Sequence, residues 1–199
     1  MTVWGMSMWG MTMSQPESDA AMRLEPATAA DLPAVVALMN AAFRGTGQAA
    51  GWNTEAGYID GDRTSIALIN EEFAEAPDAV LLLSRLGDEA ELLGCVWLEP
   101  AGDDVWYLGS LTIDPRRQNG GAGSRLLEAA EAWALERDAR TICMKVVNIR
   151  DTLIAWYGRR GYRLTGEVEP FPYGDERFGI PRRDDLLFVT LDKSLVKPG

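Results

Sequence analysis

The sequence has no histidine among its 199 residues, and it has only two cysteines. Without histidine, neither a Ser-His-Asp triad nor a Cys-His pair can form. A zinc site would have to be built from carboxylates alone, because the cysteines are not clustered either. These absences exclude the commonest nucleophilic hydrolases, and we expect no metal centre.

The two cysteines, Cys95 and Cys143, lie in separate apolar segments. A buried thiol is the usual state of cysteine in such a segment, so we expect reduced cysteines and a reducing compartment. The chain also lacks a run of about eighteen apolar residues, the length that a membrane helix needs. Residues 1–21 have neither the basic start nor the apolar block of a signal peptide. We therefore expect a cytoplasmic protein with no membrane partner.

Basic residues are scarce, since 19 lysines and arginines face 30 aspartates and glutamates, for a formal charge of −11. Nucleic acids and anionic membranes are bound through clustered basic side chains, so the composition argues against both as partners. A cationic substrate is compatible with this charge.

The length and a hydrophobic content of 47% suit one domain, which we place at residues 22–199. Residues 1–21 are rich in Met, Gly, Ser and Trp without a helical or strand period. We interpret them as a disordered N-terminal extension.

The apolar periods predict antiparallel strands followed by a βαβ-like half. A capping box at Thr28 opens a first helix that Gly45 ends, and Thr64 caps a second helix with Ile66, Ile69 and Phe73 inward. Strands are predicted over 22–25, 80–86, 92–98, 105–113, 142–147, 162–168 and 186–191, a turn around 87–89, and further helices over 121–137 and 152–160.

A glycine-rich loop joins the strand over 105–113 to the next helix, and it reads Asp114-Pro115-Arg116-Arg117-Gln118-Asn119-Gly120-Gly121-Ala122-Gly123-Ser124-Arg125. Glycines let backbone N–H groups approach an anion, and the free amides at the helix start add the positive end of its dipole. Three arginines add charge for a polyanionic ligand. Each of them is also compatible with a solvated surface position.

Two other phosphate loops fit this segment poorly. A Walker A loop needs Lys-Ser or Lys-Thr after its last glycine, where this chain has Ser124-Arg125. A dinucleotide fingerprint needs a third glycine, where this chain has Leu126. ATP, GTP and NAD are therefore disfavoured, and a tight turn without a ligand is the other alternative.

Gln118, Gly121 and Gly123 spell Q-x-x-G-x-G, which closely resembles the acetyl-CoA pyrophosphate motif of the GNAT superfamily. Further along, Asn148 and the segment 155–162 are similar to the family's N…A…Y-x-x-x-G-F/Y signature. The resemblance covers roughly residues 24–191. It implies an α/β (α+β) GNAT fold, with a mixed central sheet of six to seven strands, about four flanking helices and splayed central strands.

The resemblance implies an N-acetyltransferase with acetyl-CoA as co-substrate and a primary amine of a small molecule or peptide as acceptor, which attacks directly through a tetrahedral intermediate. A catalytically inactive acyl-CoA-sensing module is the alternative, and an interaction domain with this fold is a third. The residues expected to bind acetyl-CoA are Leu111, Thr112, Ile113, Arg116, Arg117, Gln118, Asn119, Gly120, Gly121, Ala122, Gly123, Ser124 and Asn148.

The same resemblance assigns protonation of the departing thiolate to Tyr157, although an ordinary packed tyrosine is an alternative. The general base is open, because Tyr107 occupies the strand position at which some members of the family carry a glutamate. Glu99 and Glu55 are the candidates, and a structural or solvated carboxylate is the other interpretation of each.

The acceptor is expected to contact Trp52, Tyr58 and Tyr107, since aromatic side chains suit an ammonium group. Core packing explains Trp52 equally well. The segment 169–178, with its two prolines and three aromatic residues, is long for a hairpin connection. It is a candidate to close over the acceptor or to form a homodimer contact.

Overall fold

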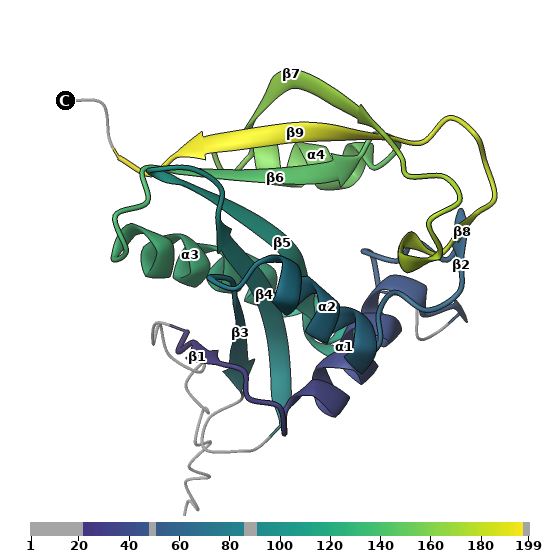
Figure 1. The fold of residues 1–199 in the computed structure, drawn as a ribbon, viewed down its shortest axis with the longest axis horizontal. Helices are drawn as coiled ribbons and strands as arrows, with labels where there is room; N and C mark the ends of the chain where they lie inside the picture. The colour runs from purple at the N-terminus through teal and green to yellow at the C-terminus, as the bar shows by residue number, and fades with distance from the viewer. Residues whose placement is uncertain (1–21, 48–50, 86–90, 197–199) are drawn as a thin grey trace, which may run out of the picture.

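The computed structural model describes residues 22–47, 51–85 and 91–196 (Figure 1). Across these residues, seven strands form one mixed sheet in the order β1-β3-β4-β5-β6-β9-β7, accompanied by four α-helices. Two further strands, β2 and β8, pair separately. The fold is the predicted one, whereas the extension 1–21 and the turn 87–89 lie outside the described residues.

The elements follow the apolar pattern closely, with two exceptions at the N-terminal end: the first strand is Glu25–Pro26 and not 22–25, and the first helix has Asp31 as its N-cap, whereas the Thr28 hydroxyl donates to the Asp31 carboxylate. The sheet strands are β1 Glu25–Pro26, β3 Val80–Arg85, β4 Leu92–Pro100, β5 Val105–Ile113, β6 Thr141–Val147, β7 Arg163–Pro170 and β9 Leu187–Ser194. The helices are α1 Leu32–Arg44, α2 Ile66–Glu75, α3 Ala122–Leu135 and α4 Asp151–Gly158, and the 3₁₀ segments include η2 Pro115–Gly120 and η3 Glu176–Phe178. The small sheet joins β2 Ile59–Asp60 to β8 Ile180–Pro181. Among these helices, none has the length and apolar character needed to span a bilayer.

Alternation along the strands divides the core between the two faces of the sheet. Leu81 and Leu83 pack with α1 and α2, while Leu82 packs with α3 and α4. The same alternation separates Cys95 from Val96. The central strands are therefore apolar on both faces, as strands covered on both sides must be.

The start of α2 differs from the prediction. Ser65 is the N-cap, because its side chain accepts a hydrogen bond from the Leu68 N–H at 3.2 Å. Thr64 instead lies one residue earlier, where its backbone N–H donates to Asn40 at 3.1 Å. Ile66 is 42% exposed, whereas Ile69 is buried and Phe73 is partly buried against the same core cluster, so the prediction was wrong for Ile66 alone.

Strands β5 and β6 separate after a short parallel ladder, as the fold predicted from the sequence requires. They are in register only from Val105 to Tyr107 on β5. On its other edge, β5 pairs with β4 but contains a bulge between the pairs Gly109↔Trp97 and Thr112↔Cys95. Ser110 lies in this bulge with a φ of 50°. A bulge bends its strand and sharpens the local twist, so β5 turns away from β6 and opens the sheet.

Candidate functional site

The glycine-rich loop leads into a helix whose N-cap has a left-handed backbone conformation. Gly121 is the N-cap of α3 and has φ 73° and ψ 6°, the left-handed region that favours glycine. A β-carbon at Gly123 would lie 3.6 Å from Trp156 Cζ2, so this backbone packs against α4. The first amides of α3 have no partner within the helix, which makes them available to an anion.

Arg116 holds the loop rather than pointing freely at a ligand. Its guanidinium binds the Asp114 carboxylate and also reaches Glu91 at 3.1 Å. The guanidinium keeps the pKa of Asp114 below its usual value, and Asp114 also accepts from the Arg116 N–H at 2.8 Å. Arg117 is exposed and has no ion pair with a described residue. Of the two neighbouring arginines, Arg117 is the one left for a ligand.

The Gln118 side chain connects the loop to the segment before α2. Its Nε2 donates to the Ile113 carbonyl at 3.4 Å, and its Oε1 accepts from the Trp52 N–H at 3.0 Å. A β-carbon at Gly51 would lie 2.6 Å from that Oε1, so the absence of a side chain at Gly51 permits the contact. Gln118 thus positions Trp52.

A pocket of about 130 Å³ lies between this loop and α4. Trp52 and Trp156 line it with ring centroids 6.0 Å apart, and so does Ser124. Arg160 stacks over the Trp156 ring at 3.6 Å, and its Nε donates to Ser124 Oγ at 3.1 Å. Trp52 therefore lies on the side of the glycine-rich loop, not with the expected acceptor contacts. Arg160 was not predicted from the sequence, although a basic residue one turn after Trp156 was a readable signal.

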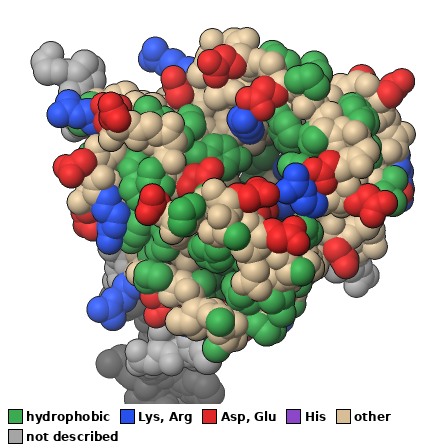
Figure 2. All heavy atoms as spheres, in the orientation of Figure 1, with side chains coloured by type: hydrophobic (Ala, Val, Ile, Leu, Met, Phe, Trp, Pro, Cys, Tyr) green, Lys and Arg blue, Asp and Glu red, His purple; other side chains and the backbone are tan. Residues whose placement is uncertain are grey.

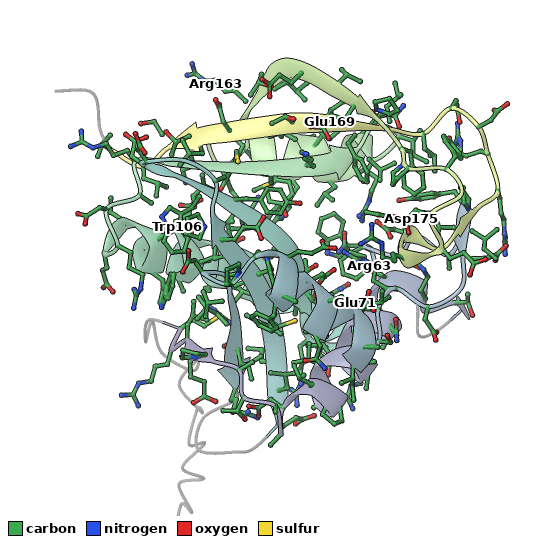
Figure 3. All side chains as sticks on the ribbon, in the orientation of Figure 1. Arg63, Glu71, Trp106, Arg163, Glu169 and Asp175 are labelled. Atoms are coloured by element: carbon green, nitrogen blue, oxygen red, sulfur yellow. The ribbon has the colours of Figure 1, made fainter. Side chains whose placement is uncertain are left out.

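A second and larger cavity, of about 500 Å³, opens where β5 and β6 separate. Figure 2 shows the hollow in this face of the molecule, with acidic and basic side chains around it. Its charged lining residues are Arg44, Glu55, Arg63, Glu71, Glu72, Glu75, Glu99, Lys145, Arg150 and Arg177. Figure 3 labels Arg63 and Glu71 in this region.

Tyr157 lines both cavities and is 5% exposed. Its ring is held edge-on by Trp156 and Tyr162, with centroids 4.9 and 5.5 Å away. Burial raises the pKa of its hydroxyl, so the group stays protonated at neutral pH. The hydroxyl makes no hydrogen bond with any residue in the described parts of the chain. Tyr157 therefore presents an uncommitted proton donor between the two cavities.

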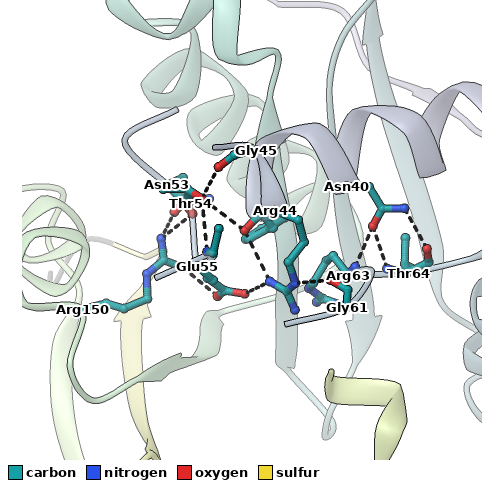
Figure 4. Close-up of polar contacts among 12 residues, drawn as sticks. Asn40, Arg44, Gly45, Asn53, Thr54, Glu55, Gly61, Arg63, Thr64 and Arg150 are labelled. Atoms are coloured by element: carbon teal, nitrogen blue, oxygen red, sulfur yellow. Dashed lines mark hydrogen bonds and ion pairs between the residues drawn. The ribbon is translucent and has the colours of Figure 1, made fainter. Parts of the chain in front are cut away.

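Glu55 is enclosed by two arginines (Figure 4). Its carboxylate lies 2.6 Å from Arg44 Nη1 and 3.1 Å from Arg150 Nη1, and each of the three side chains is 10% exposed. Arg150 also donates to the Asn53 carbonyl at 2.9 Å. Because both arginines bind it, the Glu55 carboxylate is better suited to a structural role than to the role of a general base. Arg150 was not predicted from the sequence as a site residue.

Two other carboxylates face the cavity from α2 and β4. Glu99 accepts from Trp97 Nε1 at 2.9 Å. Glu72 is open to solvent on one side, yet the surrounding protein partly desolvates it and raises its pKa. The positive charge of Arg63 opposes this rise, and the negative charge of Glu99 adds to it. The Arg63 guanidinium lies nearby and donates from Nη2 to Ser110 Oγ at 3.2 Å. Glu72 and Arg63 were not predicted as site residues.

Tyr107 and Tyr58 differ in their surroundings. The Tyr107 ring lies over Gly109, where a β-carbon would be 2.9 Å from Cε1, and it lines the large cavity. Burial raises the pKa of Tyr107 to about 12. The Tyr58 hydroxyl is buried without a hydrogen-bond partner among the described residues, and Tyr58 lines neither cavity.

Both polar atoms of the Asn148 side chain are engaged within the protein. Nδ2 donates to the Asp185 carbonyl at 3.1 Å, and Oδ1 accepts from the Leu187 N–H at 3.0 Å. Asn148 thereby ties the end of β6 to the start of β9. Of the predicted strand contacts, Leu111 and Ile113 line the small pocket, whereas Thr112 is 1% exposed. Within the described segments, no three acidic or thiol side chains converge as a metal site would require.

Residues 36–162 match the model of the Acetyltransferase (GNAT) family. Among curated protein sequences, none matches the chain significantly. A solved structure of the ribosomal-protein-S18-alanine N-acetyltransferase from Escherichia coli has a TM-score of 0.61 at 14% identity, covering 89% of this chain and 96% of that one.

Two further solved structures extend the comparison. An acetyltransferase of the GNAT family from Elizabethkingia anophelis, with acetyl-CoA bound, has a TM-score of 0.56 at 16% identity, covering 88% and 99% of the two chains. Nourseothricin acetyltransferase has a TM-score of 0.59 at 17% identity, covering 89% and 100%. At these identities the likeness is one of fold.

Proposed function

Because the chain belongs to the acetyltransferase (GNAT) family, we propose that it transfers the acetyl group of acetyl-CoA to a primary amine of a small molecule or peptide. One observation carries the proposal. The gap between β5 and β6 leads from the glycine-rich loop to a charged cavity, and Tyr157 borders both. Such a passage lets a thioester meet an amine inside the sheet.

The residues around the small pocket suit acetyl-CoA. The unpaired amides at the start of α3 and the positive charges of Arg117 and Arg160 support a pyrophosphate site at this helix start. Beyond Tyr107, the edge of β5 that faces β6 has no strand partner, although the other edge still pairs with β4. The backbone polar groups on this open edge are therefore suited to bind the amides of the pantetheine arm. Gln118 and Asn148 act as positioning residues, through Trp52 and through the start of β9.

The reaction requires two proton movements. Attack of the amine nitrogen on the thioester carbon forms a C–N bond and breaks the C–S bond, so one proton leaves nitrogen and one reaches sulfur. Tyr157 is suited to the second transfer, because burial raises the pKa of its hydroxyl and keeps it protonated. Backbone N–H groups at the β5 bulge are suited to the developing oxyanion.

The first proton needs an acceptor, because an alkylammonium has a pKa of about 10.4 and attacks only when neutral. Glu55 is engaged by two arginines, which argues against the base role. Glu72, whose pKa is raised, and Glu99 beside it line the same cavity as Tyr107. We assign proton removal to this carboxylate pair, with Tyr107 on the path from the amine.

A calorimetric titration of acetyl-CoA tests the cofactor site without knowledge of the acceptor. We expect binding of acetyl-CoA and of coenzyme A, and no heat from NADH. Gly121→Glu places a carboxylate where the pyrophosphate would lie and should abolish binding. Gly102→Glu is the matched control, because a β-carbon there meets only Val105 at 3.7 Å.

Thiol release in the presence of an amine panel then separates an enzyme from an acyl-CoA sensor. If the folded wild-type chain does not bind acetyl-CoA, the proposed acetyltransferase function is wrong. Binding without turnover on any amine would favour the sensor.

A further inference from the structure

The inner part of the large cavity carries an excess of positive charge in nearly buried side chains. Arg44 and Arg150 both bind the single carboxylate of Glu55, and all three side chains are 10% exposed. The cluster therefore holds one net positive charge. Holding an uncompensated charge largely out of water is costly, so an anion bound in the cavity would stabilise this cluster.

Both guanidiniums keep donors in reserve. Arg44 uses Nε for the Gly61 carbonyl at 3.0 Å and Nη1 for Glu55, whereas its Nη2 has no hydrogen-bond partner among the described residues. Arg150 uses both terminal nitrogens, and its Nε has no acceptor in the same part of the structure. Both residues line the cavity. Unused donors of a buried guanidinium favour a carboxylate, which accepts from them in a charge-assisted geometry.

The position of Arg150 links this anion site to the reaction. Arg150 precedes α4, the helix that carries Tyr157. The charge of Arg150 is close enough to lower the pKa of the Tyr157 hydroxyl against the stronger effect of burial. An anion bound by Arg150 thus lies in the same part of the cavity as the proposed thiol acid.

We propose that the acceptor is an amino acid or a similar compound, whose carboxylate binds Arg44 and Arg150 while its amine faces β5. This inference rests on the proposed acetyltransferase function and narrows its substrate class. Phe171 and Phe188 line the cavity as well and suit the hydrocarbon part of such a molecule. A polyamine or a plain alkylamine lacks the group that the arginines require.

The acidic side chains of α2 do not oppose this assignment. Glu71 and Glu75 are exposed at the cavity mouth, and Glu75 pairs with Arg177 at 3.3 Å. Charges open to water are screened strongly, whereas those of the buried arginine cluster are not. The arginine cluster therefore determines the orientation in which a zwitterion binds, with its carboxylate toward Arg44 and Arg150.

Matched trios of acceptors test the proposal: an amino acid, its carboxamide and its decarboxylated amine, for example phenylalanine, phenylalaninamide and phenylethylamine. We expect kcat/KM to be about tenfold or more higher for the amino acid, the effect of one or two charge-assisted hydrogen bonds. The carboxamide has the least basic amine of the three, so a larger fraction of it is neutral at a given pH. A higher kcat/KM for the amino acid than for the carboxamide therefore cannot be an effect of amine basicity. Equal or better turnover of the carboxamides and amines would overturn the inference and leave the acetyltransferase function intact.

Arg150→Lys and Arg150→Gln should remove most of this preference through KM, with acetyl-CoA affinity unchanged as the sign of an intact fold. Arg163→Gln is the matched control, since Arg163 is exposed on the edge strand β7. If no acceptor is turned over, the carboxylate site is tested by titrating N-acetylphenylalanine and N-acetylphenylethylamine into the CoA-loaded protein. Binding of the first alone supports the carboxylate site, and binding of neither overturns it.

Discussion

The substitution Glu55→Gln separates a structural carboxylate from a catalytic one. Glutamine keeps the shape and one acceptor oxygen, but it removes the negative charge between Arg44 and Arg150. Two guanidiniums would then share a nearly buried space without a counter-charge. We expect the main effect on the free energy of unfolding rather than on the chemical step.

The magnitude follows from burial. Removing one partner of a buried ion pair costs about 3 to 5 kcal/mol, and we expect the lower value because each side chain keeps 10% exposure. In a chain of this size, about 3 kcal/mol lowers Tm by roughly 6–12 °C. Carboxylate-bearing acceptors should still bind, because the positive charge of the cluster increases.

The free energy of unfolding and Tm of Glu55→Gln are measured by chemical and thermal denaturation, with Glu169→Gln as the matched control. Glu169 pairs with Lys145 at 2.8 Å, but the two side chains are 52% and 40% exposed, so its loss should cost under about 1 kcal/mol. Equal stability losses in the two variants would refute the argument from burial. Normal stability of Glu55→Gln with turnover abolished would instead restore Glu55 as the base.

Three other predictions concern the reacting groups and the sheet. Tyr157→Phe should lower kcat by about a hundredfold with acetyl-CoA affinity unchanged, and unaltered kcat would remove the hydroxyl from the mechanism. Gly94→Ala should lower the free energy of unfolding by about 2–3 kcal/mol and weaken acetyl-CoA binding, because the new methyl group would lie 2.5 Å from the Thr112 carbonyl oxygen. A denaturation midpoint unchanged from wild type would contradict this. Burial raises the pKa of Cys95 to about 12, so its thiol should resist alkylation at pH 8 until the chain unfolds, and labelling of native Cys95 would show that the core opens.

Local chemistry explains why much of the fold was predictable. The strand β5 has the bounds Val105–Ile113 that its apolar pattern predicts, and the helix after the glycine-rich loop begins one residue from the predicted position. The pair β2 and β8 was missed, because two-residue strands joined across the chain leave no periodic pattern. The position of Ile66 was wrong for a smaller reason, namely the shift of the cap to Ser65.

The site was predictable only where its residues are adjacent in sequence. The loop around Gly121 has a local cause, the left-handed backbone at a helix start. The cluster of Arg44, Glu55 and Arg150 depends on side chains from three segments, so no spacing indicated it. Trp52 was placed with the acceptor, since the sequence does not show that Gln118 draws it toward the other pocket.

The short ladder between β5 and β6 also makes the sheet two half-sheets with a weak seam. β6 pairs with β9 over its full length, Thr141–Val147, whereas its ladder with β5 ends at Cys143. A ligand that binds in the seam would hold the two halves together. At a free concentration of a hundred times its Kd, it would raise the free energy of unfolding by about 2.7 kcal/mol. If acetyl-CoA binds in this seam as proposed, we expect amide exchange to slow on both sides of it, because the ligand would hold the two half-sheets together.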